Sequence, residues 1–203
     1  MNLDWPVDRA GVAVVSPSGT ERAALGGVGG GDEFAVASVT KLMTPLAALT
    51  AIEGGRLDLD QPVPEAGDGV TVRHLLAHAS GLPFEHSGGR RAPGTRRIYS
   101  NVGFRLLGET VADAVGTVFG SWMGASVLAP LGMSATRLGS RRGFEEDPAA
   151  GAVSTLDDLE RLARCLLDRG APVLGRELFD EAASVQFPGL AGLVPGVGRF
   201  DPC

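Results

Sequence analysis

The sequence has little lysine and little tyrosine. Of its 18 basic residues 17 are arginine and one, Lys41, is lysine, while Tyr99 is the only tyrosine among 203 residues. Wherever else the sequence carries a lysine-type or arginine-type positive charge, the residue is arginine. Arginine keeps its proton in proteins, whereas a buried lysine can have its pKa lowered toward neutrality. The scarcity of both residue types makes Lys41 and Tyr99 candidates for proton-transfer chemistry.

An excess of basic residues and a long apolar run are also missing. The formal net charge of −6 argues against a nucleic-acid partner. No run of 18 apolar residues occurs, so no membrane span is expected. Because the first residues lack the basic and apolar segments of a signal peptide, the chain is expected to be cytoplasmic.

Cysteine and metal-binding patterns are equally sparse. Cys165 and Cys203 are too few for a disulfide framework, and Cys165 is expected to be buried in an apolar helix. His74 and His78 could share one face of a helix, but no glutamate completes an H-E-x-x-H arrangement. The glycine-rich residues 26–32 lack the pattern of a phosphate-binding loop. Neither a metal nor another cofactor is expected.

The remaining sequence indicates one α+β domain. Alternating apolar residues predict a hairpin over 10–15 and 20–25, within a region of sheet and loop that ends at residue 36. Residues 37–184 are predicted to be mainly helical, and residues 185–203 an irregular tail. Apolar residues at helical spacing predict helices over 42–52, 72–79, 102–115, 117–128, 154–168 and 177–183. Residues 84–95 and 137–147 are predicted to be loops.

The candidate nucleophile is Ser38, which lies between the extended run 33–37 and the apolar helix 42–52. Lys41 follows three residues later, and residues at this spacing share one face of a helix. A serine nucleophile needs a base close by, and a desolvated lysine can act as one. A single S-x-x-K pattern also arises by chance, so the pair needs further support.

A second group of residues, Tyr99-Ser100-Asn101, supplies that support. The phenol of Tyr99 is an acid or base, and the amide of Asn101 can hold a lysine or a substrate carbonyl. The structural alternative is that Tyr99 is a packing aromatic residue and Asn101 a helix cap. Together with Ser38 and Lys41, the functional interpretation is favoured.

These segments resemble the beta-lactamase-related serine hydrolases, which include class C beta-lactamases, penicillin-binding DD-peptidases and related esterases. The resemblance lies in Ser38-Val39-Thr40-Lys41, in His74-Leu75-Leu76-Ala77-His78-Ala79-Ser80-Gly81-Leu82-Pro83 and in Tyr99-Ser100-Asn101. It implies that Ser38 is acylated, that Lys41 and Tyr99 transfer the proton, and that Asn101 positions substrate or lysine. It also implies a beta-lactamase/transpeptidase-like fold, with a helical lobe beside an antiparallel sheet.

The resembling family carries a third motif, K-T-G or H-x-G, on a later strand, and nothing like it follows Tyr99 at the corresponding place. The chain is therefore expected to lack the last strands of the sheet. A two-stranded hairpin is marginal in water, and its open edge is expected to favour self-association. The missing strand would also supply an oxyanion-hole amide, so these residues alone are expected to be weakly active or inactive.

The sequence thus predicts a serine hydrolase that forms an acyl-enzyme with a small ester, amide or beta-lactam. The competing hypothesis is a catalytically incomplete remnant, or a binding module, of the same fold.

Overall fold

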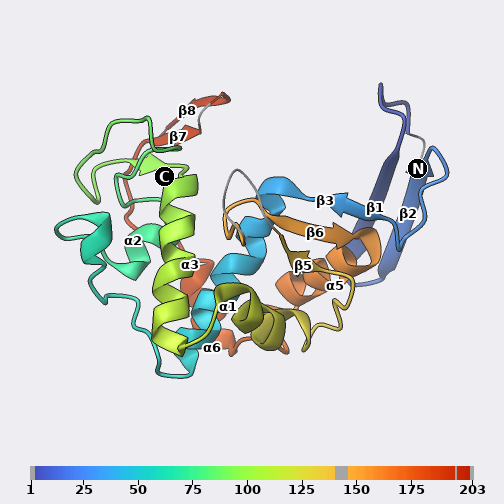
Figure 1. Ribbon diagram of the computed structural model, residues 1–203. Helices are drawn as coiled ribbons and strands as arrows, with labels where there is room; N and C mark the ends of the chain where they lie inside the picture. Colours follow the sequence, from blue (N-terminus) through green and yellow to red (C-terminus); the bar gives the residue numbers. More distant parts are fainter. Residues whose placement is uncertain (1–2, 140–145, 195, 202–203) are drawn as a thin grey trace.

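The N-terminal residues form the predicted hairpin, which stands at one side of the molecule (Figure 1). The computed structural model describes residues 3–139, 146–194 and 196–201. Strand β1 (Ala10–Ser16) pairs antiparallel with β2 (Gly19–Leu25), and the turn between them ends at Gly19, whose φ of 148° suits glycine. Helix α5 (Leu156–Leu167) packs against β1, so the hairpin is covered by a segment from late in the chain.

The other strands form two further small sheets. In the first, β6 (Ala152–Thr155) lies between β3 (Glu33–Ala35) and β5 (Arg137–Leu138), and both pairings are antiparallel. In the second, β7 (Gly192–Val194) pairs in parallel with β4 (Arg97–Ile98) and antiparallel with β8 (Gly198–Phe200).

These sheets correct three expectations. The strands form three separate sheets in the described residues, one with a parallel pair, rather than one incomplete antiparallel sheet. The tail after residue 185 contains β7 and β8, and the loop predicted over 137–147 begins with β5, while its residues 140–145 lie outside the described part. Strands of two or three residues pair with distant segments, so no local periodicity announces them.

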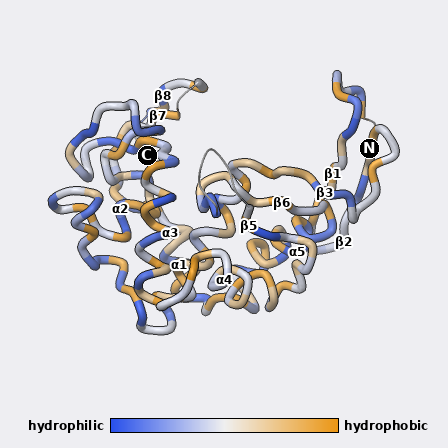
Figure 2. Tube along the Cα trace, viewed as in Figure 1, coloured by the Kyte–Doolittle hydropathy of each residue, from blue (hydrophilic) through white to orange (hydrophobic). Residues whose placement is uncertain are grey.

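The helices form a lobe around α1 (Thr40–Glu53). Helix α3 (Asn101–Val115) packs along α1 and ends at Gly116, whose φ of 73° is the left-handed conformation of a helix C-cap. Figure 2 shows hydrophobic and hydrophilic residues alternating along α3, as expected for a helix with one buried face. The shorter helices are α2 (Val72–Leu76), α4 (Phe119–Met123) and α6 (Arg176–Ala182).

Side chains cap two of the helices, and the predicted burial of Cys165 is confirmed. Ser100 caps α3 by accepting a hydrogen bond from the Gly103 amide, and Thr155 caps α5 by accepting one from Asp158. Cys165 is 2% exposed in α5, and burial raises the pKa of its thiol. The predicted helix over 117–128 is α4 followed by a π-helical segment, Gly124–Leu128. Cys203 lies outside the described residues.

The hydrophobic core fills the space between α1, α3 and the segments around them. Helix α1 is buried almost all round, because Met43, Ala47, Ala48 and Ala51 are all fully inaccessible. Small residues on α1 let the neighbouring helices approach closely. Its first turn is thereby held in the middle of the lobe, next to the start of α3.

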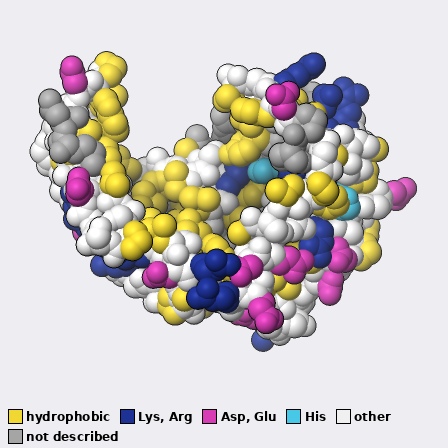
Figure 3. All heavy atoms as spheres, turned by 180° about the vertical axis from the view of Figure 1, so that it is seen from behind, with side chains coloured by type: hydrophobic (Ala, Val, Ile, Leu, Met, Phe, Trp, Pro, Cys, Tyr) yellow, Lys and Arg dark blue, Asp and Glu magenta, His cyan; other side chains and the backbone are white. Residues whose placement is uncertain are grey.

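A hollow separates the hairpin from this lobe. Seen from behind, it is lined by many hydrophobic side chains (Figure 3). Val14 of β1 is 53% exposed, and Leu42 of α1 is 47% exposed. The expected self-association through the open sheet edge stays a prediction.

The two histidines do not share a helix face, contrary to expectation. Helix α2 ends at Leu76, and His78 follows with a left-handed φ of 56°. Within the described residues, no group of three or more His, Cys, Asp or Glu side chains is arranged to hold a metal ion. In the same part of the chain no single helix is long and apolar enough to cross a membrane. Asn101–Val115 and Phe119–Leu128 reach that length and hydropathy only when taken together, and the two are bent by 78°.

Candidate active site

Ser38 lies in a short 3₁₀ turn, Ala37–Val39, which joins β3 to α1. Its side chain is exposed, so a substrate can reach the hydroxyl. Ala37, immediately before it, has a φ of 46°, a conformation that residues with a side chain seldom adopt. This placement agrees with the prediction that Ser38 stands at the start of a helix.

The buried hydroxyl of Thr40 holds this turn in place. It donates to the Ala37 carbonyl at 2.6 Å and accepts from the Ala152 amide at 3.0 Å. The Val36 amide in turn donates to the Ala152 carbonyl at 3.0 Å. The strained turn is thus tied to β6, which comes more than one hundred residues later.

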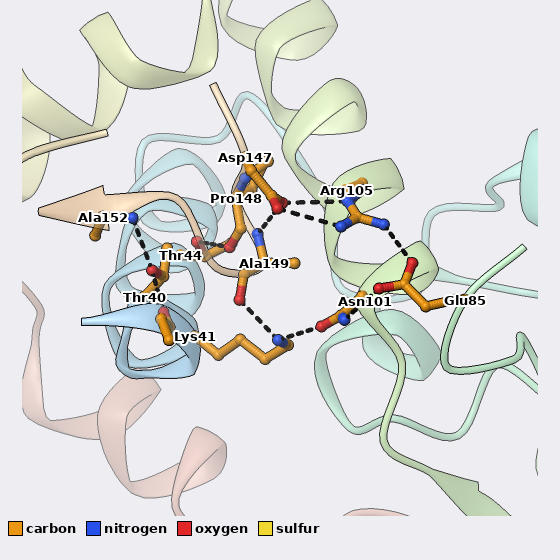
Figure 4. Close-up of polar contacts among 11 residues, drawn as sticks. Thr40, Lys41, Thr44, Glu85, Asn101, Arg105, Asp147, Pro148, Ala149 and Ala152 are labelled. Atoms are coloured by element: carbon orange, nitrogen blue, oxygen red, sulfur yellow. Dashed lines mark hydrogen bonds and ion pairs between the residues drawn. The ribbon is translucent and has the colours of Figure 1, made fainter. Parts of the chain in front are cut away.

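Lys41 points into the protein from the first turn of α1 and is only 8% exposed. Its Nζ donates to Asn101 Oδ1 at 2.6 Å and to the Ala149 carbonyl at 2.7 Å (Figure 4). Burial lowers the pKa of Lys41, an effect that contact with the Tyr99 side chain opposes. The only lysine of the chain is therefore a desolvated amine, as the sequence suggested.

Tyr99 lies between β4 and α3, where its amide donates to the Leu193 carbonyl at 3.0 Å. Lys41 Nζ is 4.6 Å from the centroid of its ring. The Tyr99 ring also contacts His78, with 4.8 Å between ring centroids. Tyr99 is thus half-buried beside the lysine, which joins the two residue types that the chain uses only once.

His78 is a neighbour whose role the sequence did not indicate. Its ring stacks on Phe104 at 4.6 Å, and its Nδ1 accepts a hydrogen bond from the Ser100 amide at 3.1 Å. Burial, with smaller contributions from Lys41 and Arg97, lowers the pKa of His78 to about 3. The imidazole is therefore neutral at pH 7 and supports the segment that carries Tyr99.

Asn101 is the first residue of α3 and is 6% exposed. Its Oδ1 accepts from Lys41, and its Nδ2 donates to Glu85 Oε1 at 2.9 Å. Ser100, rather than Asn101, caps the helix with its side chain. The alternative reading of Asn101 as a helix cap is therefore wrong, and its amide belongs to the lysine site.

Three charged residues of the site were missed from the sequence: Glu85, Arg105 and Asp147. Arg105 lies one turn after Asn101 on α3, so helical spacing could have indicated it. Glu85 lies in the predicted loop 84–95, and Asp147 at the end of the predicted loop 137–147. No pattern in these loops announces a buried polar contact.

A cavity of about 240 Å³ lies against Tyr99. Its walls include His78, Arg97 and the strands β7 and β8. Tyr99 therefore joins the buried amine of Lys41 to a space of small-molecule size, whose described lining includes neither Ser38 nor Lys41.

The sequence matches a known protein family, and the fold matches solved structures. The family model described as "Beta-lactamase" matches residues 6–191. The solved structure of a beta-lactamase from Mycobacterium bovis superposes with a TM-score of 0.86 and 41% identity, over 98% of this chain and 69% of that one.

Two curated proteins align with parts of the chain. The D-alanyl-D-alanine-carboxypeptidase/endopeptidase AmpH of Escherichia coli is 29% identical over an alignment of 136 residues, and the match covers 50% of this chain and 35% of that protein. Esterase EstB of Burkholderia gladioli is 43% identical over an alignment of 63 residues, and the match covers 25% of this chain and 16% of that protein. The chain thus matches about a third of the length of the first of these relatives.

Proposed function

The chain belongs to the beta-lactamase family of serine hydrolases, and we propose that it forms an acyl-enzyme at Ser38 with a small ester or amide, beta-lactams included. The observation that carries this proposal is the position of Lys41. A buried amine with a lowered pKa follows an exposed serine by three residues, at the strained start of a helix. A lysine in this state can take the proton of a serine hydroxyl.

The proposed reaction has two halves. Ser38 Oγ attacks the substrate carbonyl carbon, while its proton passes to the Lys41–Tyr99 pair. The bond to the leaving group breaks, and the leaving oxygen or nitrogen takes that proton. A water molecule then adds to the acyl carbon and gives a proton to the same pair. The bond between the acyl carbon and Ser38 Oγ breaks, Oγ takes that proton, and the acid is released.

The residues have distinct proposed roles. Ser38 is the nucleophile, and Lys41 with Tyr99 carries the proton between nucleophile, leaving group and water. Asn101 holds Lys41 through Oδ1 at 2.6 Å. The expected cytoplasmic location favours a small ester or amide over cell-wall peptide and remains a prediction from the sequence.

Intact-mass spectrometry with a fluorophosphonate tests the nucleophile. Attack by Ser38 forms an oxygen–phosphorus bond and expels fluoride, so the protein gains the mass of one phosphonyl group. The adduct should form on the wild type and be lost in Ser38→Ala. Ser18→Ala is a matched control, because Ser18 is an exposed serine in the hairpin turn. Parallel incubations with p-nitrophenyl acetate, an amino-acid amide and a penicillin compare the substrate classes.

The second candidate is a catalytically incomplete member of the fold. It is favoured by the hydrogen bonds of Lys41, whose Nζ donates to Asn101 Oδ1 and to the Ala149 carbonyl rather than to a serine. It predicts that the fluorophosphonate adds no mass to the wild type. Labelling that persists in Ser38→Ala would contradict both candidates and place the reactive group elsewhere.

A further inference from the structure

We propose that Glu85, Arg105 and Asp147 are positioning residues, which fix the two hydrogen-bond acceptors of the Lys41 side chain. This inference rests on the proposed function only where it concerns rate. It follows from a closed ring of hydrogen bonds that connects these residues with Lys41 (Figure 4).

The ring begins at one acceptor of Lys41, Asn101, and closes at the other, Ala149. Lys41 Nζ donates to Asn101 Oδ1 at 2.6 Å, Asn101 Nδ2 to Glu85 Oε1 at 2.9 Å, and Arg105 Nη1 to Glu85 Oε2 at 2.7 Å. Arg105 continues to Asp147 through Nε and Nη2, both at 3.2 Å. The Ala149 amide donates to Asp147 Oδ1 at 2.9 Å, and the Ala149 carbonyl accepts from Lys41 at 2.7 Å.

Glu85 determines which way the Asn101 amide faces. A carboxylate only accepts hydrogen bonds, so the Asn101 group beside Glu85 must be the NH₂. The amide oxygen is then directed at Lys41, where an acceptor is needed. With a glutamine at position 85, the amide of Asn101 could turn round and bring its NH₂ against the lysine. The charge and the two acceptors of Glu85 thus act on Lys41 through Asn101.

Arg105 and Asp147 fix the second acceptor. Arg105 is 5% exposed and Asp147 is fully buried, and the guanidinium spans the two carboxylates. A planar guanidinium with several donors suits this bridging, which a lysine could not reproduce. Asp147 also holds the Ala149 amide, which turns the Ala149 carbonyl toward Lys41.

The segment that carries Asp147 and Ala149 is tied to the lysine helix as well. The Thr44 hydroxyl, one turn after Lys41, donates to the Pro148 carbonyl at 2.7 Å. Glycine is needed at position 151, where a Cβ would stand 2.4 Å from the Gly139 carbonyl oxygen. Lys41 and its acceptors are therefore parts of one packed unit, which preorganises the amine.

The charges of the ring balance when Lys41 is protonated. Lys41 and Arg105 are then positive, and Glu85 and Asp147 negative. Burial lowers the pKa of Lys41 and is the largest effect. Asp147 raises this pKa and Arg105 lowers it, each by less than burial does. Among the described residues, the other titratable groups that face the amine are Tyr99 and His78, the latter with a pKa of about 3.

The single lysine makes a direct test available. Protein grown with [¹³C]lysine gives one lysine side-chain signal, whose pH titration reports Lys41 without any substrate. Glu85→Gln removes a negative charge and frees the Asn101 amide to turn. Both changes disfavour the ammonium form, so the midpoint of the titration should move to lower pH.

Glu33→Gln is the matched control. Glu33 also forms a pair with an arginine, Arg137, but on the exposed surface at 2.6 Å. The same substitution there should leave the Lys41 titration unchanged. Circular dichroism and the melting temperature establish that each variant is folded. If Glu85→Gln does not fold, Glu85→Asp replaces it, since this variant keeps the charge but shortens the side chain. Its midpoint should move in the same direction but by less.

A rate measurement separates this inference from the proposed function. The pH profile of fluorophosphonate labelling should shift to lower pH in Glu85→Gln, with a plateau about tenfold lower because the proton acceptor is less well positioned. If the wild type is not labelled but the lysine midpoint still moves, the proposed function fails and the ring stands. If the folded variants titrate like the wild type, the positioning role is wrong.

Discussion

The lobe around α1 and the N-terminal hairpin differ in how completely their side chains are buried. In the lobe, α1 is enclosed by α3 and its neighbours, and even its polar side chains Lys41 and Thr44 have buried partners. The hairpin has two strands and α5 against it, and Val14 of β1 remains half exposed. A buried amine can be held in place only where packing is complete, which explains why the lysine site lies in the lobe.

An ion pair outside the lobe differs from one inside it in the same way. Arg105 and Asp147 are 5% and 0% exposed, whereas Arg137 and Glu33, which belong to the sheet β3–β6–β5, are 58% and 47% exposed. An exposed pair contributes little, since water and salt screen it. A buried pair is costly to break, because one partner is left uncompensated.

Removing the amine should have the largest effect and should separate function from stability. Lys41→Met keeps the length of the side chain but removes its proton chemistry, so fluorophosphonate labelling should slow by about 10²–10⁴-fold. The free energy of unfolding should fall by only about 1–3 kcal/mol, because Asn101 Oδ1 and the Ala149 carbonyl lose their buried donor. Mass spectrometry of samples quenched at successive times measures the labelling rate, and thermal unfolding measures the stability. Labelling at the wild-type rate would remove Lys41 from the mechanism.

Breaking the buried and the exposed ion pair comes next. Asp147→Ala should lower the free energy of unfolding by about 3–5 kcal/mol, because Arg105 is left buried with one partner fewer. Glu33→Ala should cost about 0–1 kcal/mol. Urea denaturation of both variants gives the comparison. Equal losses would show that burial does not distinguish the two ion pairs.

The pH dependence of stability should follow His78. Its pKa is about 3 in the folded protein and 6.5 in its ordinary state, so the unfolded chain binds the extra proton first. The contribution is therefore present above about pH 6.5 and is lost as the pH falls toward 3, by about 1.4 kcal/mol for each pH unit. His78→Gln should flatten this part of the urea-denaturation profile. An unchanged slope would show that carboxylates alone govern it.

Hydrogen exchange should show the smallest difference. Amides of β1 and β2 should exchange at least about tenfold faster than those of α1 and α3, because the hairpin opens without breaking the core of the lobe. Mass-spectrometric exchange of peptides from both regions measures this. Equal protection would mean that the hairpin and the lobe unfold as one unit.

The sequence by itself indicated the local elements and the chemically unusual residues. Helix α1, the hairpin and the caps at Ser100 and Thr155 follow from patterns within a few residues. Lys41 and Tyr99 stood out because each residue type occurs once, and the structure brings both beside Asn101. Helical spacing from Asn101 would also have led to Arg105.

Only the tertiary structure decided what surrounds the lysine. Glu85, Asp147 and Ala149 come from loops whose sequences have no period, and their contacts join residues 16 to 108 positions apart. The pairing of β4 with β7 likewise depends on two short segments that meet through the fold. Local sequence determines which backbone conformations are favourable, but a buried polar partner is set by the path of the whole chain, because only that path excludes water from both groups.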